Sequence, residues 1–172
     1  MPAIPDVAPI GPGIVPTTLY NQLVAAIAFL LRPPIAELRT ASAQSITSGT
    51  WTALQFDVDD IDSANGHDTA VNNTRYTAQY PGTLEVSGGY GPSSNAVGVR
   101  GTRFALNGTV VNASQMVVPA ASLVLGPARV KKIPMNQGDY VEIQAFQSSG
   151  GNLAGSGSAN EVSSFTIKFV SA

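Results

Sequence analysis

Cysteine is absent from this sequence of 172 residues. Disulfide bonds and thiolate metal sites are therefore excluded, and the fold must be held by packing and hydrogen bonds. A chain without cysteine tolerates reducing conditions, which fits assembly in a cytoplasm.

Charged residues are scarce, at 12% of the sequence with a formal net charge of −2. This share is about half that of an average globular protein. The closest basic group, Arg129 with Lys131 and Lys132, is too small to neutralise a run of phosphates, so we expect no nucleic-acid partner. Because interface cores are depleted in charge, the low charge content favours an oligomer.

Long hydrophobic runs are also missing. The longest, Leu23 to Leu31, has nine residues, whereas a membrane-spanning helix needs about 20. The first 16 residues contain five prolines and no basic residue, unlike a signal peptide. We expect no membrane partner.

Groups that carry chemistry are few. The single histidine, His67, lies in a turn-rich segment, and no G-x-S-x-G elbow for a serine nucleophile is present. One histidine without cysteine cannot supply a tetrahedral zinc site. We expect no catalytic residue, no metal and no cofactor. The acidic group Asp57, Asp59, Asp60 and Asp62 lacks the spacing of an EF-hand, and a solvated acidic loop is favoured over a calcium site.

Residues 1–34 predict an attachment segment ahead of the main domain. Proline at positions 2, 5, 9, 12 and 16 denies residues 1–16 a regular ladder and predicts an extended arm. A helix follows, for which Thr17 or Thr18 is the expected cap. Pro33-Pro34 ends it, because proline lacks an N–H and disfavours α geometry in the residue before it.

Apart from Asn21 and Gln22, this helix is apolar nearly all round. A helix lying on its own domain needs only one apolar side. We therefore favour burial against other subunits, as a three-helix cluster or on a larger protein shell, over packing on its own domain. The candidate interface residues are Leu19, Tyr20, Leu23, Val24, Ile27, Phe29, Leu30 and Leu31.

Residues 35–172 predict one all-β sandwich domain, because short alternating segments recur with turn signals between them. The expected strands are 35–48, 50–56, 75–80, 83–90, 96–106, 109–118, 121–133, 138–147 and 162–170. Trp51 and Phe56 are expected to point inward. Segment 57–73 is expected to be an acidic loop, and the Gly/Ser-rich segment 148–160 a flexible or tip loop.

Two turn signals stand out. Pro81-Gly82 breaks an alternating apolar pattern and predicts a hairpin-like corner between the strands on either side. Asn107-Gly108 is the strongest hairpin signal, because both residues tolerate the positive φ of a type I′ turn.

The segment 138–147 has two apolar faces. Val141, Ile143 and Ala145 alternate on one face, as expected of a core strand. The opposite face carries Tyr140 and Phe146, so we predict that a second surface of this strand is buried against another subunit.

Several segments follow one another in the order of a known family. They are TWTALQFD (50–57), GHDTAVNNTR (66–75), YPGTLEVSG (80–88), RGTRFALNGT (100–109), NQGDYVEIQAFQ (136–147) and SSFTIKFVS (163–171). This set resembles the C1q/TNF-like jelly roll and is most similar to the C1q-like domains of tailed-phage virion proteins. The resemblance implies a jelly-roll fold and a homotrimer associated through aromatic-rich faces.

The resemblance also implies a function. We expect a structural bacteriophage virion protein, a trimeric capsid decoration protein whose residues 1–34 bind the major capsid protein or another shell protein. It would be assembled in the host cytoplasm and lie on the virion, more on the capsid surface than on the tail. The alternative is a tail or baseplate tip protein that binds a host-surface glycan or receptor through segments 57–73 and 148–160. An enzyme such as a depolymerase would need a carboxylate pair in a cleft, which the sequence does not indicate.

Overall fold

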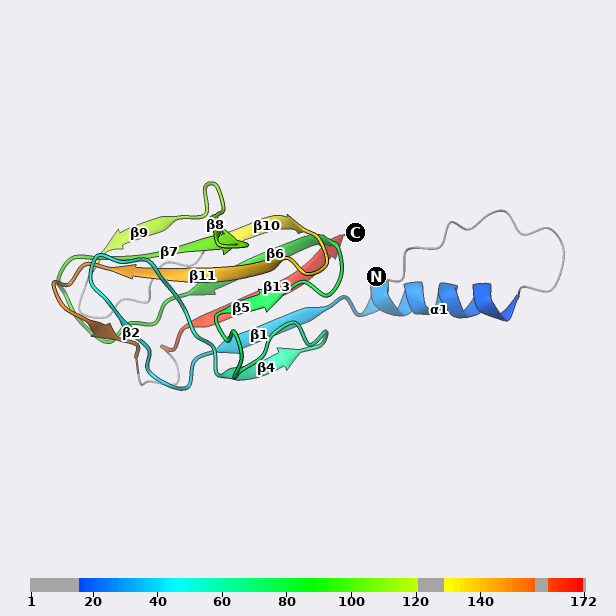
Figure 1. Ribbon diagram of the computed structural model, residues 1–172, viewed down its shortest axis with the longest axis horizontal. Helices are drawn as coiled ribbons and strands as arrows, with labels where there is room; N and C mark the ends of the chain where they lie inside the picture. The colour runs from blue at the N-terminus through cyan, green and yellow to red at the C-terminus, as the bar shows by residue number, and fades with distance from the viewer. Residues whose placement is uncertain (1–15, 121–128, 157–160, 172) are drawn as a thin grey trace.

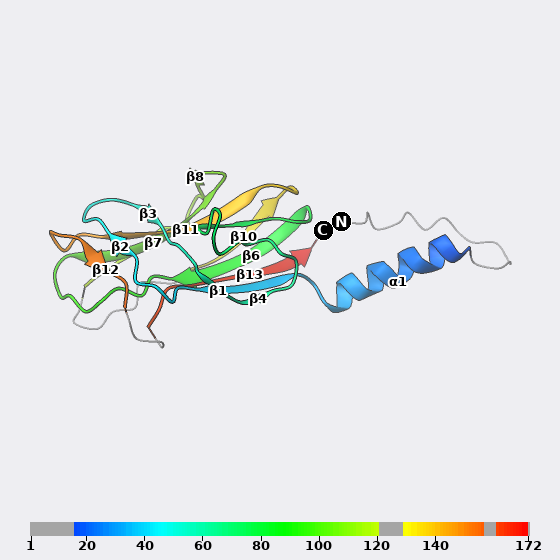
Figure 2. The same ribbon diagram turned by 60° about the horizontal axis from the view of Figure 1, so that its bottom comes forward.

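Two antiparallel β-sheets packed face to face form the body of the molecule, and a helix projects from one end (Figures 1 and 2). The structure is a computed structural model that describes residues 16–120, 129–156 and 161–171. The helix is α1 (Thr17–Leu31). The predicted all-β sandwich is confirmed. The predicted arm, residues 1–16, lies outside the described residues except for Pro16.

The first sheet has five strands in the order β10-β6-β13-β1-β4. Their bounds are β10 (Arg129–Met135), β6 (Gly82–Gly89), β13 (Ser164–Ser171), β1 (Ile35–Arg39) and β4 (Val58–Asp62). β10 thus begins at Arg129, and residues 121–128 of the strand expected over 121–133 lie outside the described residues.

The second sheet is built around β11, which has neighbours on both edges. One edge of β11 (Tyr140–Gln147) pairs with β3 (Thr52–Ala53) and β5 (Arg75–Thr77), and the other pairs with β7 (Val99–Leu106). β7 also pairs with β8 (Thr109–Val110) and β9 (Met116–Pro119). A small ladder joins β2 (Ser45–Ile46) to β12 (Leu153–Ala154).

The core lies between the two sheets and is made by every second residue of the strands. Phe165 of β13 stacks on Phe56 at 5.8 Å and on Phe104 of β7 at 6.0 Å between ring centroids. All three rings are 2% exposed or less. Burying a phenylalanine contributes roughly 1.5–3 kcal/mol, so this stack is a major link between the sheets.

The corner at Pro81-Gly82 takes the chain from one sheet to the other. The expected hairpin is wrong, because β5 pairs with β11 whereas β6 pairs with β13 and β10. Gly82 has φ +151°, and a Cβ there would lie 2.4 Å from the carbonyl oxygen of Ser171. Only glycine fits this crossing without strain.

The segments before this corner also differ from the prediction. Segment 35–48 is not one strand. Ala41 and Ala43 are exposed, and residues 40–44 between β1 and β2 are not part of a strand. The acidic segment is not wholly a loop, because β4 pairs with β1 as an edge strand. Solvent-facing carboxylates suit an edge strand, since they discourage pairing with other chains.

The turn predicted at Asn107-Gly108 is confirmed, and a further turn joins β10 to β11. Asn107 and Gly108 have φ of +49° and +78° and connect β7 to β8. Gly138, with φ +89°, lies in the turn in which the N–H of Asn136 donates to the Asp139 carboxylate at 2.7 Å.

Buried polar groups close the end of the sandwich that lies opposite α1 (Figure 2). The fully buried Gln147 donates to the carbonyls of Ile46 at 2.8 Å and Gly151 at 2.7 Å, and accepts from the N–H of Ser149. The described part of segment 148–160, which was expected to be a flexible or tip loop, lies at this end of the sandwich, is tied down and contains β12.

Arg100 reinforces the same end. It is 1% exposed, and its guanidinium donates to the carbonyls of Asn95, Val97 and Val99 at 2.8–3.0 Å. These bonds hold the connection between β6 and β7. The neighbouring Tyr90 is also buried, and burial raises the pKa of its hydroxyl to about 12, although the Arg100 charge acts against this rise.

Replacing Gln147 by leucine tests the polar closure of this end. Gln147→Leu leaves two carbonyls and one N–H without their partner, and each such loss costs about 1–3 kcal/mol. We expect the free energy of unfolding in urea to fall by about 3 kcal/mol or more. Gln137→Leu, at an exposed turn position, is the control and should change it by less than about 0.5 kcal/mol. Equal losses in both variants would contradict the role of the amide.

Candidate attachment surface and outer sheet face

Helix α1 exposes apolar side chains on several sides. None of its residues is buried, and Tyr20, Leu30 and Leu31 are 60%, 71% and 76% exposed. Three further predicted interface residues are exposed, namely Leu23, Val24 and Ile27, and Leu19 is half-buried. The helix carries no charged residue. A surface of this kind is uncommon on a monomeric protein.

The helix begins differently from the prediction. Pro16 occupies the cap position, and neither Thr17 nor Thr18 donates or accepts a side-chain cap hydrogen bond. Proline suits a helix start because its missing N–H has no intrahelical partner there. The predicted end is confirmed: the last helical hydrogen bond runs from the Arg32 N–H to the Ala28 carbonyl, immediately before Pro33.

Phe29 differs from the other apolar residues of the helix because it packs on the chain's own sandwich. Its ring meets Tyr80 at 5.3 Å and Phe169 at 4.9 Å, both edge-on. Such pairs contribute about 0.5–1.5 kcal/mol beyond burial. Phe29, Tyr80 and Phe169 thus form the contact between the helix and the sandwich, which we call the seat of the helix. Phe29 does not belong to the exposed interface residues.

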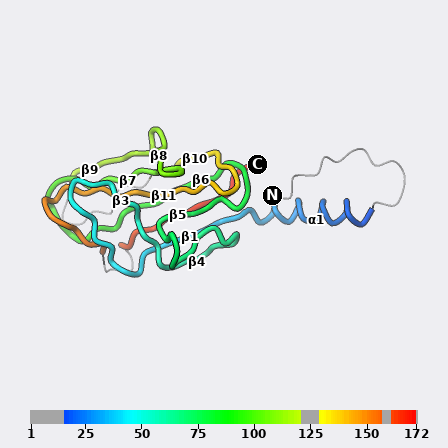
Figure 3. The backbone as a smooth tube through the Cα atoms, in the orientation of Figure 1, coloured from blue at the N-terminus to red at the C-terminus, as the bar shows by residue number. Residues whose placement is uncertain are grey.

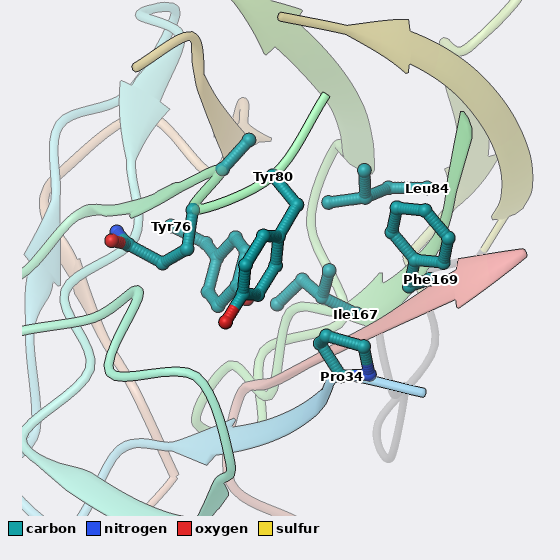
Figure 4. A pocket seen from close by; sticks show the side chains of 8 residues that line it. Pro34, Tyr76, Tyr80, Leu84, Ile167 and Phe169 are labelled. Carbon is teal, nitrogen blue, oxygen red and sulfur yellow. The ribbon is translucent and has the colours of Figure 1, made fainter. Parts of the chain in front are cut away.

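A small void beside this seat is lined by Pro34, Tyr76, Leu84 and Phe169 among others (Figure 4). Its volume is about 10 Å³, which is room for one water molecule at most. Burial raises the pKa of the Tyr76 hydroxyl well above its ordinary value, and the nearby Asp62 and Tyr80 act in the same direction. The seat is a packed junction and not a ligand site.

The outer face of the second sheet carries the remaining predicted interface residues, Tyr140 and Phe146. Phe146 lies 5.1 Å from Trp51, so the expected inward orientation of Trp51 is wrong. The indole lies over Gly101, where a Cβ would approach its Cη2 to 3.1 Å. The guanidinium of Arg103 covers the indole at 4.3 Å from its centroid.

A second arginine stacks on the same face. The guanidinium of Arg75 lies 4.6 Å from the centre of the Tyr140 ring. Glu142, directly opposite Arg75 in the ladder, instead accepts a hydrogen bond from the Thr74 hydroxyl at 3.0 Å. Desolvation lowers the pKa of Arg103, whose Nε donates to the Gln144 side chain at 2.7 Å.

The predicted interface residues thus form two separate surfaces. The exposed residues of α1 project from one end of the sandwich, whereas Tyr140 and Phe146 lie on a sheet face (Figures 1 and 2). Sequence reasoning missed Arg75 and Arg103. Both occupy outward positions of strands beside β11, but the pairing that brings them there is not visible in local sequence.

His67 has a structural environment. Its side chain is fully buried, with Nδ1 at 2.6 Å from the Asp59 carboxylate and Nε2 at 3.2 Å from the Asn73 carbonyl. The ring also lies edge-on to Phe56 at 6.4 Å. Nδ1 therefore ties the loop to β4 and Nε2 ties it to the loop's own end at Asn73, and no side-chain hydroxyl contacts either nitrogen in the described part of the chain.

Each carboxylate of the acidic group has its own partner. Asp60 forms an ion pair with Arg39 at 2.9 Å, Asp62 accepts from the His67 N–H at 2.9 Å, and Asp57 accepts from the N–H groups of Ala41 and Ser42. Across the described residues, no three histidine or acidic side chains converge as a metal site would require. The group ties loops to strands.

No helix among the described residues is both long enough and apolar enough to span a bilayer, since α1 has 15 residues.

Comparison with family models and with curated proteins finds no match to this sequence. Solved structures do match the fold. The globular domain of zebrafish complement 1qA protein is 11% identical over 80% of this chain and 97% of that chain, with a TM-score of 0.58. Murine APRIL at pH 8.5 is 10% identical over 79% of this chain and 98% of that chain, also with a TM-score of 0.58. The chain has the predicted C1q/TNF-like jelly-roll fold.

The environment of Asp57 makes part of the stability depend on pH. Burial acts to raise the pKa of Asp57, but hydrogen bonds from Ser42 and Ala41 outweigh it, so the pKa lies below its ordinary value. The ionised carboxylate therefore stabilises the fold above the unfolded pKa of about 3.9, and this contribution is lost as pH falls through the folded value.

We expect Asp57→Asn to lower the free energy of unfolding at pH 7, because the ionised acceptor of two backbone N–H groups is lost. The loss should be only about 1 kcal/mol, since solvent weakens hydrogen bonds at this partly exposed position. The difference from the unaltered chain should shrink at pH 3, measured by urea unfolding. Asp60→Asn, in an exposed ion pair, is the control and should change the free energy by about 0.5 kcal/mol or less. A difference for Asp57→Asn that does not vary with pH would refute the assignment.

Proposed function

We propose that this chain is a structural, non-enzymatic protein of a tailed-phage virion. In this proposal it is a trimeric capsid decoration protein that attaches through residues 1–34 and displays residues 35–172 outward as a separate domain. The observation that carries the proposal is the exposed, uncharged apolar surface of α1. The phage context is supported by the ordered sequence motifs.

The energetics of α1 favour a covering partner. Full burial of one leucine, isoleucine or valine side chain contributes roughly 1.5–3 kcal/mol, and five of these are exposed: Leu23, Val24, Ile27, Leu30 and Leu31. Among the described residues, Phe29 is the α1 side chain that packs against the sandwich core. The remaining surface suits the major capsid protein or another shell protein.

Trimerisation is supported by the fold and by composition. The jelly-roll resemblance implies three-fold association, and the low charge content favours covered surfaces. In the proposal the protein lies on the virion surface after assembly in the host cytoplasm. It acts without enzymatic activity and without contact with nucleic acid or membrane.

A tail or baseplate tip protein that binds a host-surface glycan or receptor is the second candidate. The end formed by β2 and β12 lies opposite α1 (Figures 2 and 3), so attachment through the helix would point this end away from the particle. Segment 63–74 instead lies beside β1 and β4. The Ile35 N–H donates to the Ser63 hydroxyl at 2.9 Å, and His67 Nδ1 lies 2.6 Å from the Asp59 carboxylate. The two segments expected to form one tip are therefore apart.

The oligomeric state is the first test. We expect the purified full chain to sediment as a trimer at micromolar concentration. A monomer under these conditions would remove the support for association through the outer aromatic residues and α1.

Charges placed on the helix test attachment. Leu23→Asp with Ile27→Asp should abolish incorporation into particles, because a buried carboxylate without a partner is strongly unfavourable. Thermal unfolding should show that the β-sandwich stays folded. Asn21→Asp with Gln22→Asp adds the same charge at the helix's polar positions and should leave incorporation unchanged.

Particles that still carried the Leu23→Asp, Ile27→Asp protein would rule out α1 as the anchor. Electron microscopy of particles with the chain labelled separates the two candidates, since a capsid decoration protein places the label on heads and a tip protein places it on tails.

A further inference from the structure

We propose that the open hollow beside Arg75 is a binding site for a neutral sugar residue. The hollow lies between segment 65–72 and the outward side of β5, and its volume is about 470 Å³. Sites for small molecules have volumes of about 300–1,000 Å³. This proposal concerns a surface separate from α1 and does not depend on virion attachment.

The lining of the hollow is unusually polar for a ligand site, which commonly has mostly apolar walls. Side chains that can bond hydroxyl groups come from both sides. They are Asn65, Asp68, Asn72, Arg75, Thr77 and Gln79. An apolar ligand would gain little here, whereas a ring bearing several hydroxyls could exchange hydrogen bonds with many of these groups.

Much of this hydrogen-bonding capacity is unused. Among the described residues, no carboxylate lies within ion-pair distance of Arg75, whose guanidinium is held only by the Tyr140 ring. The side-chain amides of Asn65 and Asn72 form no hydrogen bond with any residue that the structure describes. Gln79 uses its amide N–H on the Thr77 carbonyl at 3.1 Å, which leaves its oxygen as an acceptor.

Arg75 and the loop that faces it are held in place. The Arg75 guanidinium is stacked on Tyr140, and the Arg75 backbone N–H donates to the Asn72 carbonyl at 3.2 Å. Beneath the hollow, buried His67 ties the loop to Asp59 and Asn73. Groups fixed before binding lose less conformational entropy when a ligand arrives.

Charge decides the class of sugar. The hollow has one cation, Arg75, and one carboxylate, Asp68, at its wall. One oxygen of Asp68 accepts from the N–H groups of Ala70 and Val71 at 2.8 Å, which lowers its pKa and keeps it ionised. An acidic sugar would meet this carboxylate, whereas neutral hydroxyls can bond to both charged groups.

The test is a titration of the full chain followed by amide NMR. The probes are glucose, galactose, mannose and rhamnose, with glucuronate as the charged comparison. We expect at least one neutral sugar to bind with a Kd of about 1–10 mM, as is usual for a small ligand on an open site. The shifted amides should fall within residues 65–79.

Matched variants locate the site. Arg75→Gln should weaken binding about tenfold or more, whereas Arg103→Gln removes the same charge from the same sheet face outside the hollow and should leave Kd unchanged. Asn65→Gly and Asn72→Gly delete the amides while allowing the positive φ of +54° and +57° at these positions. Each should weaken binding, which provides a test even if Arg75→Gln does not fold.

Three results would overturn the proposal. They are no shift with any neutral sugar, binding of glucuronate alone, and equal weakening in Arg75→Gln and Arg103→Gln. The last would mean that the sheet face attracts ligands by charge in general.

Discussion

The stack of Phe56, Phe165 and Phe104 is the contact on which the sandwich depends. Phe165 comes from β13, which lies between β1 and β6 in the first sheet, and Phe104 comes from β7 in the second. Without cysteine the chain has no disulfide between its sheets, so apolar burial must hold them together. The inward positions of the strands are consequently fixed by the core, and function is left to the ends and outer faces.

The two ends of the sandwich are closed by different chemistry. Away from α1, Gln147 and Arg100 fill the end with hydrogen bonds to backbone carbonyls. At the other end, Phe29 closes it by packing on Tyr80 and Phe169. A polar closure ties loops down and leaves the outside wettable, whereas an apolar closure continues directly into the exposed apolar helix. The two ends of the sandwich therefore differ in polarity, and burial of the helical end is the more favourable.

The sequence predicted the elements whose signals are local. The alternation in 138–147 and 162–170 corresponds to β11 and β13, and Asn107-Gly108 forms the expected hairpin. Pairing was not predictable in the same way, because β5 and β6 are adjacent in sequence but belong to different sheets. β4 was not predicted as a strand because its aspartates interrupt the alternation of apolar residues; in the structure they lie at a sheet edge. The exposed residues of α1 could be predicted because the helix segment is apolar nearly all round. The stacking of Arg75 and Arg103 could not, because it depends on which strands pair with β11.

The way the few charges are used bears on assembly. Asp57, Asp60 and Asp139 each bind a partner within the chain, through backbone N–H groups, Arg39, and Asn107 with Asn136. Arg100 is wholly enclosed. In a chain with only 12% charged residues and a formal net charge of −2, little net charge keeps separate copies apart in water. Low repulsion and an exposed apolar helix act in the same direction, since both make a covered state more favourable than a solitary one. The polar hollow beside Arg75 is the contrasting case, because its hydrogen-bonding groups can bond to water and so need no covering partner.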